Sequence, residues 1–387
     1  MKRITVLGLL VALLLAGCDS SAVPQDPTRY PTWPHAGIRI LQQYPYELTQ
    51  GSALAGRWLS TAPGGQTVFA EATLPNFVIA LPVNDRHQSV LLDLGDGTSV
   101  DNLAYGETNQ VYFTGMVEAP SAQGSAVLTR AILEVDRYNY TMLSITPLPR
   151  DKAVRGFVTA RGGRAYLYLV SGAGEGSILG LSLYNGLVLG NRRIGLVPAA
   201  MGRKGMAVDR DGRYLYCLTG GEAGVSDFTP VTDEPTEPHL AVVGVDSLAV
   251  VHRVALPGDY EPQAVYYHEI RERVYVVAGS RKGARIYEID AAFFYIRNVV
   301  DLPSAVSDLA LTELYGFAPA ANGIYVIDLA TLAYSARPGL PFTQTGEMSV
   351  TPDAVTGLIQ FFSSYQGGGP GVAVVDLATG QLREVWN

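Results

Sequence analysis

Short apolar runs alternate with turn-forming residues along most of the chain. Seven of these runs are rich in valine, leucine, tyrosine and phenylalanine, and they begin at positions 68, 111, 165, 214, 274, 314 and 358. Short runs of β-branched and aromatic residues between turn residues are typical of β-strands. Beyond residue 36 we find no convincing periodicity of an amphipathic helix. The pattern therefore predicts an all-β fold.

The seven runs belong to a repeated unit. They begin 40 to 60 residues apart, and each is followed by a second strand that commonly ends in an acidic or amide residue, as at 242–246 and 286–290. Most units add a strand after this pair, such as 250–254, and another before it, such as 205–208. Four strands per unit with a period in the forties are typical of a propeller blade. The sequence predicts a single seven-bladed β-propeller of four-stranded antiparallel blades over residues 37–387.

The later units share closely similar sequences. Residues 274–277 read VYVV, residues 325–331 read YVIDLAT, and residues 374–380 read VVDLATG. These segments resemble the YVTN family of seven-bladed propellers, and the resemblance extends over residues 50–387 as architecture. The resemblance implies the same seven-bladed fold. The WD40 class is disfavoured, because no Trp-Asp pair occurs in the chain.

Two segments compete to complete the last blade. Residues 38–41 have the pattern of an outer strand, and so do residues 382–385. Closing the ring removes exposed sheet edges, so we expect one of the two to take that place.

The first eighteen residues have the pattern of a targeting segment. Met1 to Arg3 is basic, and residues 4–16 form an apolar run that is too short to span a bilayer comfortably. The run ends in Leu-Ala-Gly-Cys at 15–18, which resembles the lipobox of bacterial lipoproteins. That resemblance implies removal of residues 1–17 and lipidation of Cys18. An ordinary secretory signal is the alternative.

These patterns divide the chain into three parts. Residues 1–17 are predicted to be a lipoprotein signal peptide, and residues 18–36 a lipidated cysteine followed by a proline-rich tether. Residues 37–387 are predicted to form the propeller. We therefore expect a protein of the bacterial cell envelope that is anchored to a membrane through its lipid, with the propeller facing the periplasm or the cell exterior.

Composition narrows the partners and the chemistry. Hydrophobic residues make up 48% of the chain, which excludes a disordered protein, and two cysteines are too few for a disulfide framework. The net charge of −8 argues against a nucleic-acid partner, which requires a basic face. Cys217 lies within an apolar run, so we expect a buried and unreactive thiol.

The candidate chemistry gathers at one mouth of the central channel. The first strand of each propeller blade lines this channel, so the residues at the start of those strands should converge. The candidate ligand site comprises Asn102, Arg155, Lys204, Gln263, Asp308 and Glu347. One interpretation is a wet, polar mouth in which the cations balance the carboxylates. The other is a set of oxygen ligands for a hard cation such as calcium. No other cofactor is predicted.

One insertion lengthens the fourth unit. Residues 220–238 carry five acidic residues and three prolines, and four of the acidic residues are Asp227, Asp233, Glu234 and Glu237. Long loops of this kind either carry recognition or are merely solvated excursions. We treat these four residues as a candidate recognition loop.

The predicted function is that of a binding or scaffold module for an envelope protein, a polymer or a small ligand. The alternative is a periplasmic metal-dependent hydrolase of lactonase type with its site at the channel mouth. No catalytic residue is assigned, because the chain contains no G-x-S-x-G motif, no P-loop and no C-x-x-C pair.

Overall fold

The computed structural model describes residues 33–40, 42–45, 59–62, 67–71, 77–82, 89–94, 98–107, 109–120, 126–149, 151–220, 237–351, 353–362 and 371–386. Within these residues the chain forms strands and turns and no helix, so no helix there is long and apolar enough to cross a membrane. The all-β prediction is confirmed.

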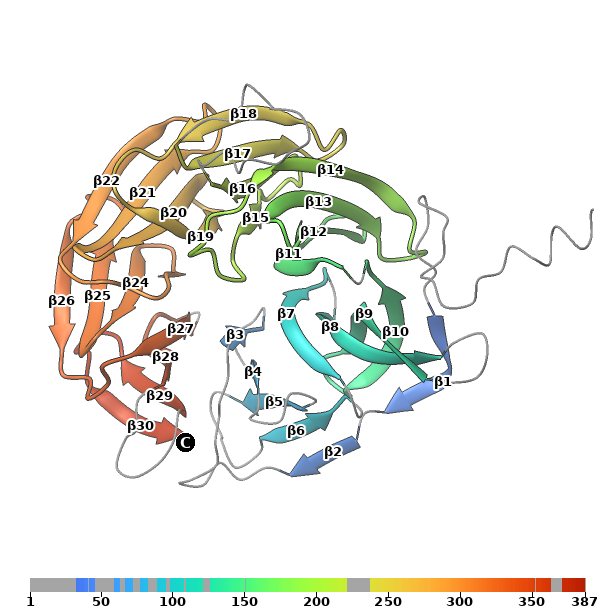
Figure 1. Cartoon of the computed structure of the whole chain (residues 1–387). Coiled ribbons are helices and arrows are strands. Elements are labelled where there is room, and N and C mark those ends of the chain that lie inside the picture. Colours follow the sequence, from blue (N-terminus) through green and yellow to red (C-terminus); the bar gives the residue numbers. More distant parts are fainter. Residues whose placement is uncertain are drawn as a thin grey trace, which may run out of the picture.

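The described residues form seven antiparallel sheets arranged as a ring, and each sheet is one blade (Figure 1). Blade 1 contains β3 (Leu59–Thr61), β4 (Thr67–Glu71), β5 (Phe77–Pro82) and β6 (Val90–Asp93), and blade 2 contains β7 (Ser99–Tyr105), β8 (Gln110–Pro120), β9 (Ala126–Asp136) and β10 (Thr141–Pro147). Blade 3 contains β11 (Ala153–Ala160), β12 (Arg164–Val170), β13 (Glu175–Ser182) and β14 (Val188–Leu196), and blade 4 contains β15 (Met206–Val208), β16 (Tyr214–Thr219), β17 (His239–Gly244) and β18 (Val250–Ala255). Blade 5 contains β19 (Glu261–His268), β20 (Arg273–Ser280), β21 (Gly283–Asp290) and β22 (Ile296–Leu302). Blade 6 contains β23 (Ala310–Leu311), β24 (Tyr315–Ala320), β25 (Gly323–Asp328) and β26 (Tyr334–Pro338), and blade 7 contains β27 (Thr345–Val350), β28 (Thr356–Phe361), β29 (Gly371–Asp376) and β30 (Leu382–Trp386).

The seven apolar runs of the sequence lie in the second strand of each blade, which confirms the predicted repeat. In β12 and in β28 five successive residues are buried. Neighbouring blades cover both faces of these strands, so both sets of alternating side chains are apolar. This burial explains why the sequence shows continuous apolar runs there instead of strict alternation.

The last blade is completed by the C-terminal segment. Residues 382–386 form β30, which pairs with β29, whereas residues 38–40 belong to β1 in a different blade. In the described residues no strand is shared between the first and the last blade. Blades 1 and 7 are instead joined by an apolar cluster that consists chiefly of Leu59, Val68, Ala70, Ile79, Leu81, Leu358, Val372 and Trp386.

Two strands near the N-terminus extend the outer edges of the first blades. Strand β1 (Trp33–Ile40) pairs antiparallel with β10 of blade 2, and β2 (Gln42–Pro45) pairs antiparallel with β6 of blade 1. These blades therefore have five strands each. Strand β1 begins at Trp33, within the last residues of the predicted tether, so this segment joins the propeller at the outer edge of blade 2. Cys18 lies outside the described residues.

Candidate functional site

The inner strands of four blades carry a β-bulge near their first residues. Asp101, Arg155 and Gln263 are the extra residues of these bulges in β7, β11 and β19, and the irregularity in β27 lies at residues 346–347. A bulge bends the strand and re-aims a side chain, and such irregularities are common next to functional sites. Gln263 and Glu347 therefore occupy the same position in their strands as Asp101 and Arg155 do in theirs. In β7 this position comes one residue before Asn102.

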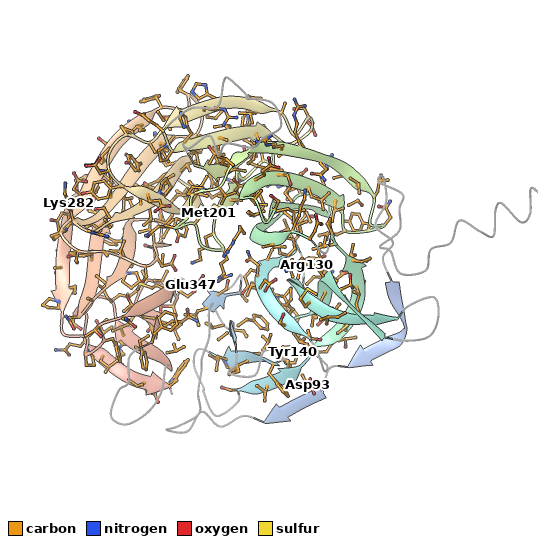
Figure 2. The ribbon with its side chains drawn as sticks, in the orientation of Figure 1. Asp93, Arg130, Tyr140, Met201, Lys282 and Glu347 are labelled. Carbon is orange, nitrogen blue, oxygen red and sulfur yellow. The ribbon has the colours of Figure 1, made fainter. Side chains whose placement is uncertain are left out.

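An ion pair joins opposite parts of the ring at this mouth. The Arg203 guanidinium donates from Nε and Nη2 to the carboxylate of Glu347, and both side chains are 13% exposed. Arg203 lies in the segment that leads into blade 4, and Glu347 lies in β27 of blade 7, near the centre of the ring (Figure 2). Arg203 Nη1 also donates to Oδ1 of Asn102 at 3.1 Å, and the Leu59 amide donates to Glu347 Oε2 at 3.1 Å. Blades 1, 2, 4 and 7 are thereby connected.

A second ion pair lies beside the first. Lys204 Nζ donates to Asp308 Oδ2 at 2.6 Å, and the Met348 amide donates to the same oxygen at 2.7 Å. The hydroxyl of Tyr266 donates to the other oxygen of Asp308. Asp308 is 1% exposed. Burial acts to raise the pKa of this carboxyl group, but the Lys204 ammonium and the donors around it lower the pKa below its usual value.

The four charged side chains of Arg203, Lys204, Asp308 and Glu347 form what we call the central ion cluster. Two cations balance two carboxylates, and each carboxylate oxygen accepts at least one hydrogen bond. Among the described residues, no three histidine, cysteine, aspartate or glutamate side chains come together as a metal site would need. The arrangement matches a polar mouth in which the cations balance the carboxylates.

Of the remaining predicted residues, Asn102 contacts this cluster through Arg203. Gln263 is half-buried, and its carbonyl oxygen accepts from the Gly202 amide at 3.1 Å. Arg155 is exposed, and Glu237 is exposed just before β17. Asp227, Asp233 and Glu234 lie outside the described residues, so the recognition loop stays a prediction.

Sequence reasoning missed Arg203. This residue precedes Lys204 in a Gly-Arg-Lys-Gly segment between blades 3 and 4, where no strand pattern draws attention to it. Two adjacent cations at the entry to one inner strand, together with acidic residues at the start of two other inner strands, are the signal that indicates the cluster.

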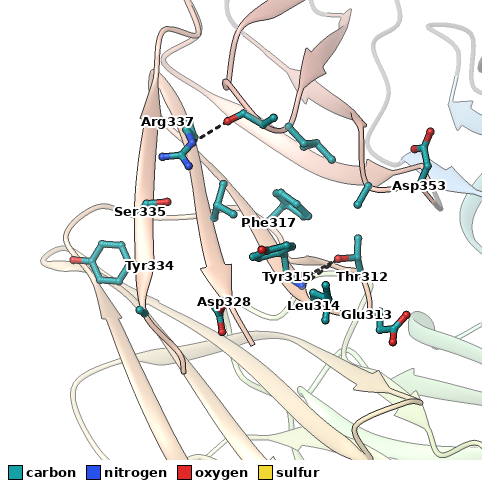
Figure 3. Close-up of a pocket in the computed structure, with 15 residues that line it drawn as sticks. Thr312, Glu313, Leu314, Tyr315, Phe317, Asp328, Tyr334, Ser335, Arg337 and Asp353 are labelled. Atoms are coloured by element: carbon teal, nitrogen blue, oxygen red, sulfur yellow. Dashed lines mark hydrogen bonds between the residues drawn. The ribbon is translucent and has the colours of Figure 1, made fainter. Parts of the chain in front are cut away.

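A groove of about 780 Å³ lies between blades 6 and 7 (Figure 3). Much of its wall comes from turns that join the first to the second strand and the third to the fourth strand of each blade. In an antiparallel blade these turns lie at the end opposite to the connection between blades, so the groove opens toward the face away from the central ion cluster. Its lining comprises Thr312, Glu313, Leu314, Tyr315, Phe317, Val326, Asp328, Ala333, Tyr334, Ser335, Arg337, Asp353, Ala354, Leu377 and Ala378.

The groove combines an apolar interior with an acidic rim. Phe317 and Leu377 are each 3% exposed, whereas Leu314, Tyr315 and Tyr334 are 57%, 39% and 43% exposed. Figure 3 shows Tyr315 beside Phe317 in the middle of the groove, with Tyr334 and Arg337 toward one side.

Three acidic residues, Glu313, Asp328 and Asp353, surround this apolar surface. The backbone amides of Thr331 and Ala330 lower the pKa of Asp328, and the hydroxyl of Thr351 lowers the pKa of Asp353. Both aspartates are therefore anionic at neutral pH. Arg337 is the single basic residue among the described residues of the lining, and it donates from Nε to the carbonyl oxygen of Ala378 at 3.2 Å.

Comparison with known proteins identifies the fold and no family. No family model matches the chain, and no curated protein matches it. The YVTN resemblance therefore stays a prediction.

Solved structures with the same architecture do match. Kuenenia stuttgartiensis hydrazine synthase has 12% identity and a TM-score of 0.56, with coverage of 86% of this chain and 98% of that one. The β-propeller domain of Myceliophteria thermophila Cps50 (Swd1) has 9% identity and a TM-score of 0.55, with coverage of 86% and 96%.

The dihydro-heme d1 dehydrogenase NirN, in complex with DHE, has 14% identity and a TM-score of 0.53, with coverage of 85% of this chain. The match spans 65% of the length of NirN. At these identities the likeness concerns the fold alone, and the three proteins have different functions.

Proposed function

We propose that this protein is a binding module of the bacterial cell envelope, and that the groove between blades 6 and 7 receives an extended polypeptide segment with apolar and basic side chains. The observation that carries the proposal is that three exposed apolar side chains, Leu314, Tyr315 and Tyr334, line one groove. Exposed apolar surface in a depression with a polar rim is typical of interaction sites. Tyrosine is also enriched at protein interfaces, because it combines a large apolar ring with a polar hydroxyl group.

Charge favours a basic partner. The lining contains three acidic residues and one arginine, and the whole chain has a net charge of −8. A lysine or arginine side chain of the partner would lie near the carboxylates of Glu313, Asp328 and Asp353. The exposed faces of Tyr315 and Tyr334 would add cation–π attraction to the same group.

The proposed attachment leaves the groove accessible. The chain enters the propeller at β1 on blade 2, and the groove lies on the opposite side of the ring in Figure 1. The segment between Cys18 and Trp33 spans at most about 50 Å when fully extended. A lipid on Cys18 would therefore hold the disc near the membrane by one edge, with the groove directed away from the point of attachment.

The groove proposal is tested with synthetic peptides. A short fluorescein-labelled peptide of alternating lysine and leucine is titrated with the protein and followed by fluorescence anisotropy. We expect saturable binding that weakens about tenfold or more in a Tyr315→Ser, Tyr334→Ser variant. Tyr184→Ser is the matched control, because Tyr184 is 77% exposed on blade 3. The proposal would be contradicted if a peptide of alternating glutamate and leucine bound as tightly as the lysine and leucine peptide, or if the double variant bound the latter with unchanged affinity.

The anchor is tested separately by fractionation. Cys18→Ala should release the protein from membranes, because acyl chains on this residue would supply the attachment. Membrane retention of Cys18→Ala equal to that of the wild type would refute the lipid anchor and leave the groove proposal unaffected.

A further inference from the structure

A cavity of about 330 Å³ lies at the channel mouth between blades 2 and 3. Its lining comprises Asp101, Arg130, Ala153, Val154, Arg155 and Arg203. Arg130 lies where the two blades adjoin (Figure 2). Three guanidinium groups thus line one small cavity in a chain whose net charge is −8.

The charges of this cavity do not balance. Arg203 is paired with Glu347, and Arg130 Nη1 is paired with Asp101. Arg155 is exposed, and its guanidinium has no hydrogen bond or ion pair within the part of the chain that the structure describes. The cavity therefore carries an excess positive charge, and it belongs to Arg155.

Arg130 is also incompletely satisfied. Its side chain is only 14% exposed, and its Nε atom is buried without an acceptor among the described residues. Asp101 occupies a single nitrogen of this guanidinium, and its own side chain is 25% exposed. A poorly hydrated guanidinium beside a second, unpaired one raises the affinity of the cavity for negative charge.

The backbone holds Arg155 in place. Arg155 is the extra residue of the bulge in β11, and its carbonyl oxygen accepts from the Gly205 amide of the neighbouring segment at 3.1 Å. The next residue, Gly156, packs so closely that a Cβ there would lie 2.8 Å from Cβ of Met206. The base of the Arg155 side chain is therefore fixed, so less conformational entropy is lost when a ligand binds.

We propose that this cavity binds a small ligand that bears an oxyanion group, a carboxylate or a phosphate, with Arg155 as the principal contact and Arg130 as the second. A planar guanidinium donates two parallel hydrogen bonds to such a group, which a halide ion cannot accept in the same way. The volume lies at the lower end of the range for ligand sites, which favours a molecule of the size of a tricarboxylate or smaller. This site is on the other face from the groove, and neither proposal depends on the other.

The test uses isothermal titration calorimetry with citrate and with inorganic phosphate, at constant ionic strength maintained with sodium chloride. We expect saturable binding of at least one probe by the wild type. Binding of citrate alone would assign the site to carboxylates, and binding of phosphate alone would assign it to phosphate groups. In Arg155→Gln the Kd should rise about tenfold or more, because a charged hydrogen-bond donor is lost.

Arg192→Gln is the matched control, since Arg192 is an exposed arginine of β14 in the same blade. It should bind the probes as the wild type does. Thermal unfolding of both variants at the wild-type temperature would show that the fold is intact. The proposal is overturned if the wild type binds neither probe, if Arg155→Gln binds with unchanged affinity, or if Arg192→Gln weakens binding equally.

Discussion

Arg203 and Glu347 form a two-pronged ion pair at the centre of the propeller, although 144 residues separate them in the sequence. They belong to blades 4 and 7, which are as far apart as two blades of a seven-membered ring can be. Together with Asn102 and Leu59, this pair links the two ends of the ring without a shared strand. The central ion cluster therefore has a structural role in holding the blades in register.

Removal of one charge from this pair should destabilise the fold strongly. Glu347→Gln leaves the Arg203 guanidinium buried and uncompensated, which costs about 3 kcal/mol or more of unfolding free energy. Guanidinium chloride unfolding measures the difference. Glu269→Gln is the control, because Glu269 pairs with Arg210 at the surface, where both side chains are more than half exposed. This control should cost less than about 1 kcal/mol.

A double variant distinguishes the effect of the charges on stability from the effect of the volume that the two side chains fill. Arg203→Met with Glu347→Leu replaces both charges by apolar groups and should recover part of the stability lost in Glu347→Gln. Equal stability of Glu347→Gln and Glu269→Gln would refute the structural role of the ion pair between Arg203 and Glu347.

Asp308 should make stability depend on pH in the acidic range. Its folded pKa is lowered below the ordinary value of 3.8, since the Lys204 ammonium and its hydrogen-bond donors outweigh burial. The carboxylate therefore contributes stability above about pH 4, and this contribution is lost as the pH falls through the folded pKa.

The unfolding free energies of the wild type and of Asp308→Asn are measured at pH 7 and at pH 3. The difference in unfolding free energy should be large at pH 7 and should narrow at pH 3. Asp246→Asn provides a control, because its side chain is 93% exposed. A difference for Asp308→Asn that is the same at both values of pH would count against this account.

The blade pattern was predictable from the sequence, but the pairing of residues across the ring was not. The apolar runs in β12 and β28 predict buried strands, because a strand that is buried on both faces has apolar side chains at successive positions. Lys204 and Asp308 were also predicted as opposing charges at the channel mouth, and the structure pairs them. The role of Arg203 was not predicted, because it depends on how close the segment between blades 3 and 4 lies to the centre of the ring. Strand periodicity does not determine that position.

The groove between blades 6 and 7 was unpredictable for a related reason. Leu314 and Tyr334 belong to different strand boundaries of blade 6, and Asp353 belongs to a turn of blade 7. Each residue is unremarkable within its own repeat. They form one surface only because two blades pack side by side with a defined twist.

Cys217 should be unreactive in the folded protein. The thiol is fully buried in an apolar cluster, and burial raises its pKa far above neutrality. In a Cys18→Ala variant it is the sole cysteine, so Ellman's reagent at pH 8 reports on it alone. We expect no labelling of the native protein and one thiol per chain in denaturant. Rapid labelling of the native protein would disprove the predicted burial.

Trp386 should secure the seam between the last blade and the first. The side chain is 3% exposed and packs in the cluster that unites residues of blades 1 and 7. Trp386→Ala should cost about 3 to 5 kcal/mol, because a large buried side chain is removed. Phe293→Ala is the control, since Phe293 is 77% exposed and its loss should cost less than about 0.5 kcal/mol.

The strands that lose protection in Trp386→Ala show whether this residue acts at the contact between blades 1 and 7 or as an ordinary core residue. In the described sheets blades 1 and 7 share no strand, and apolar packing joins them together with the hydrogen bond from the Leu59 amide to Glu347. Trp386→Ala should therefore accelerate amide hydrogen exchange in β4 and β28 before it does so in β12 and β16. Trp386→Phe retains most of the apolar contact and removes an indole Nε1 that has no acceptor among the described residues, so its effect should be smaller. Uniform acceleration in all blades would mean that the ring unfolds as one cooperative unit and that the seam has no separate weakness.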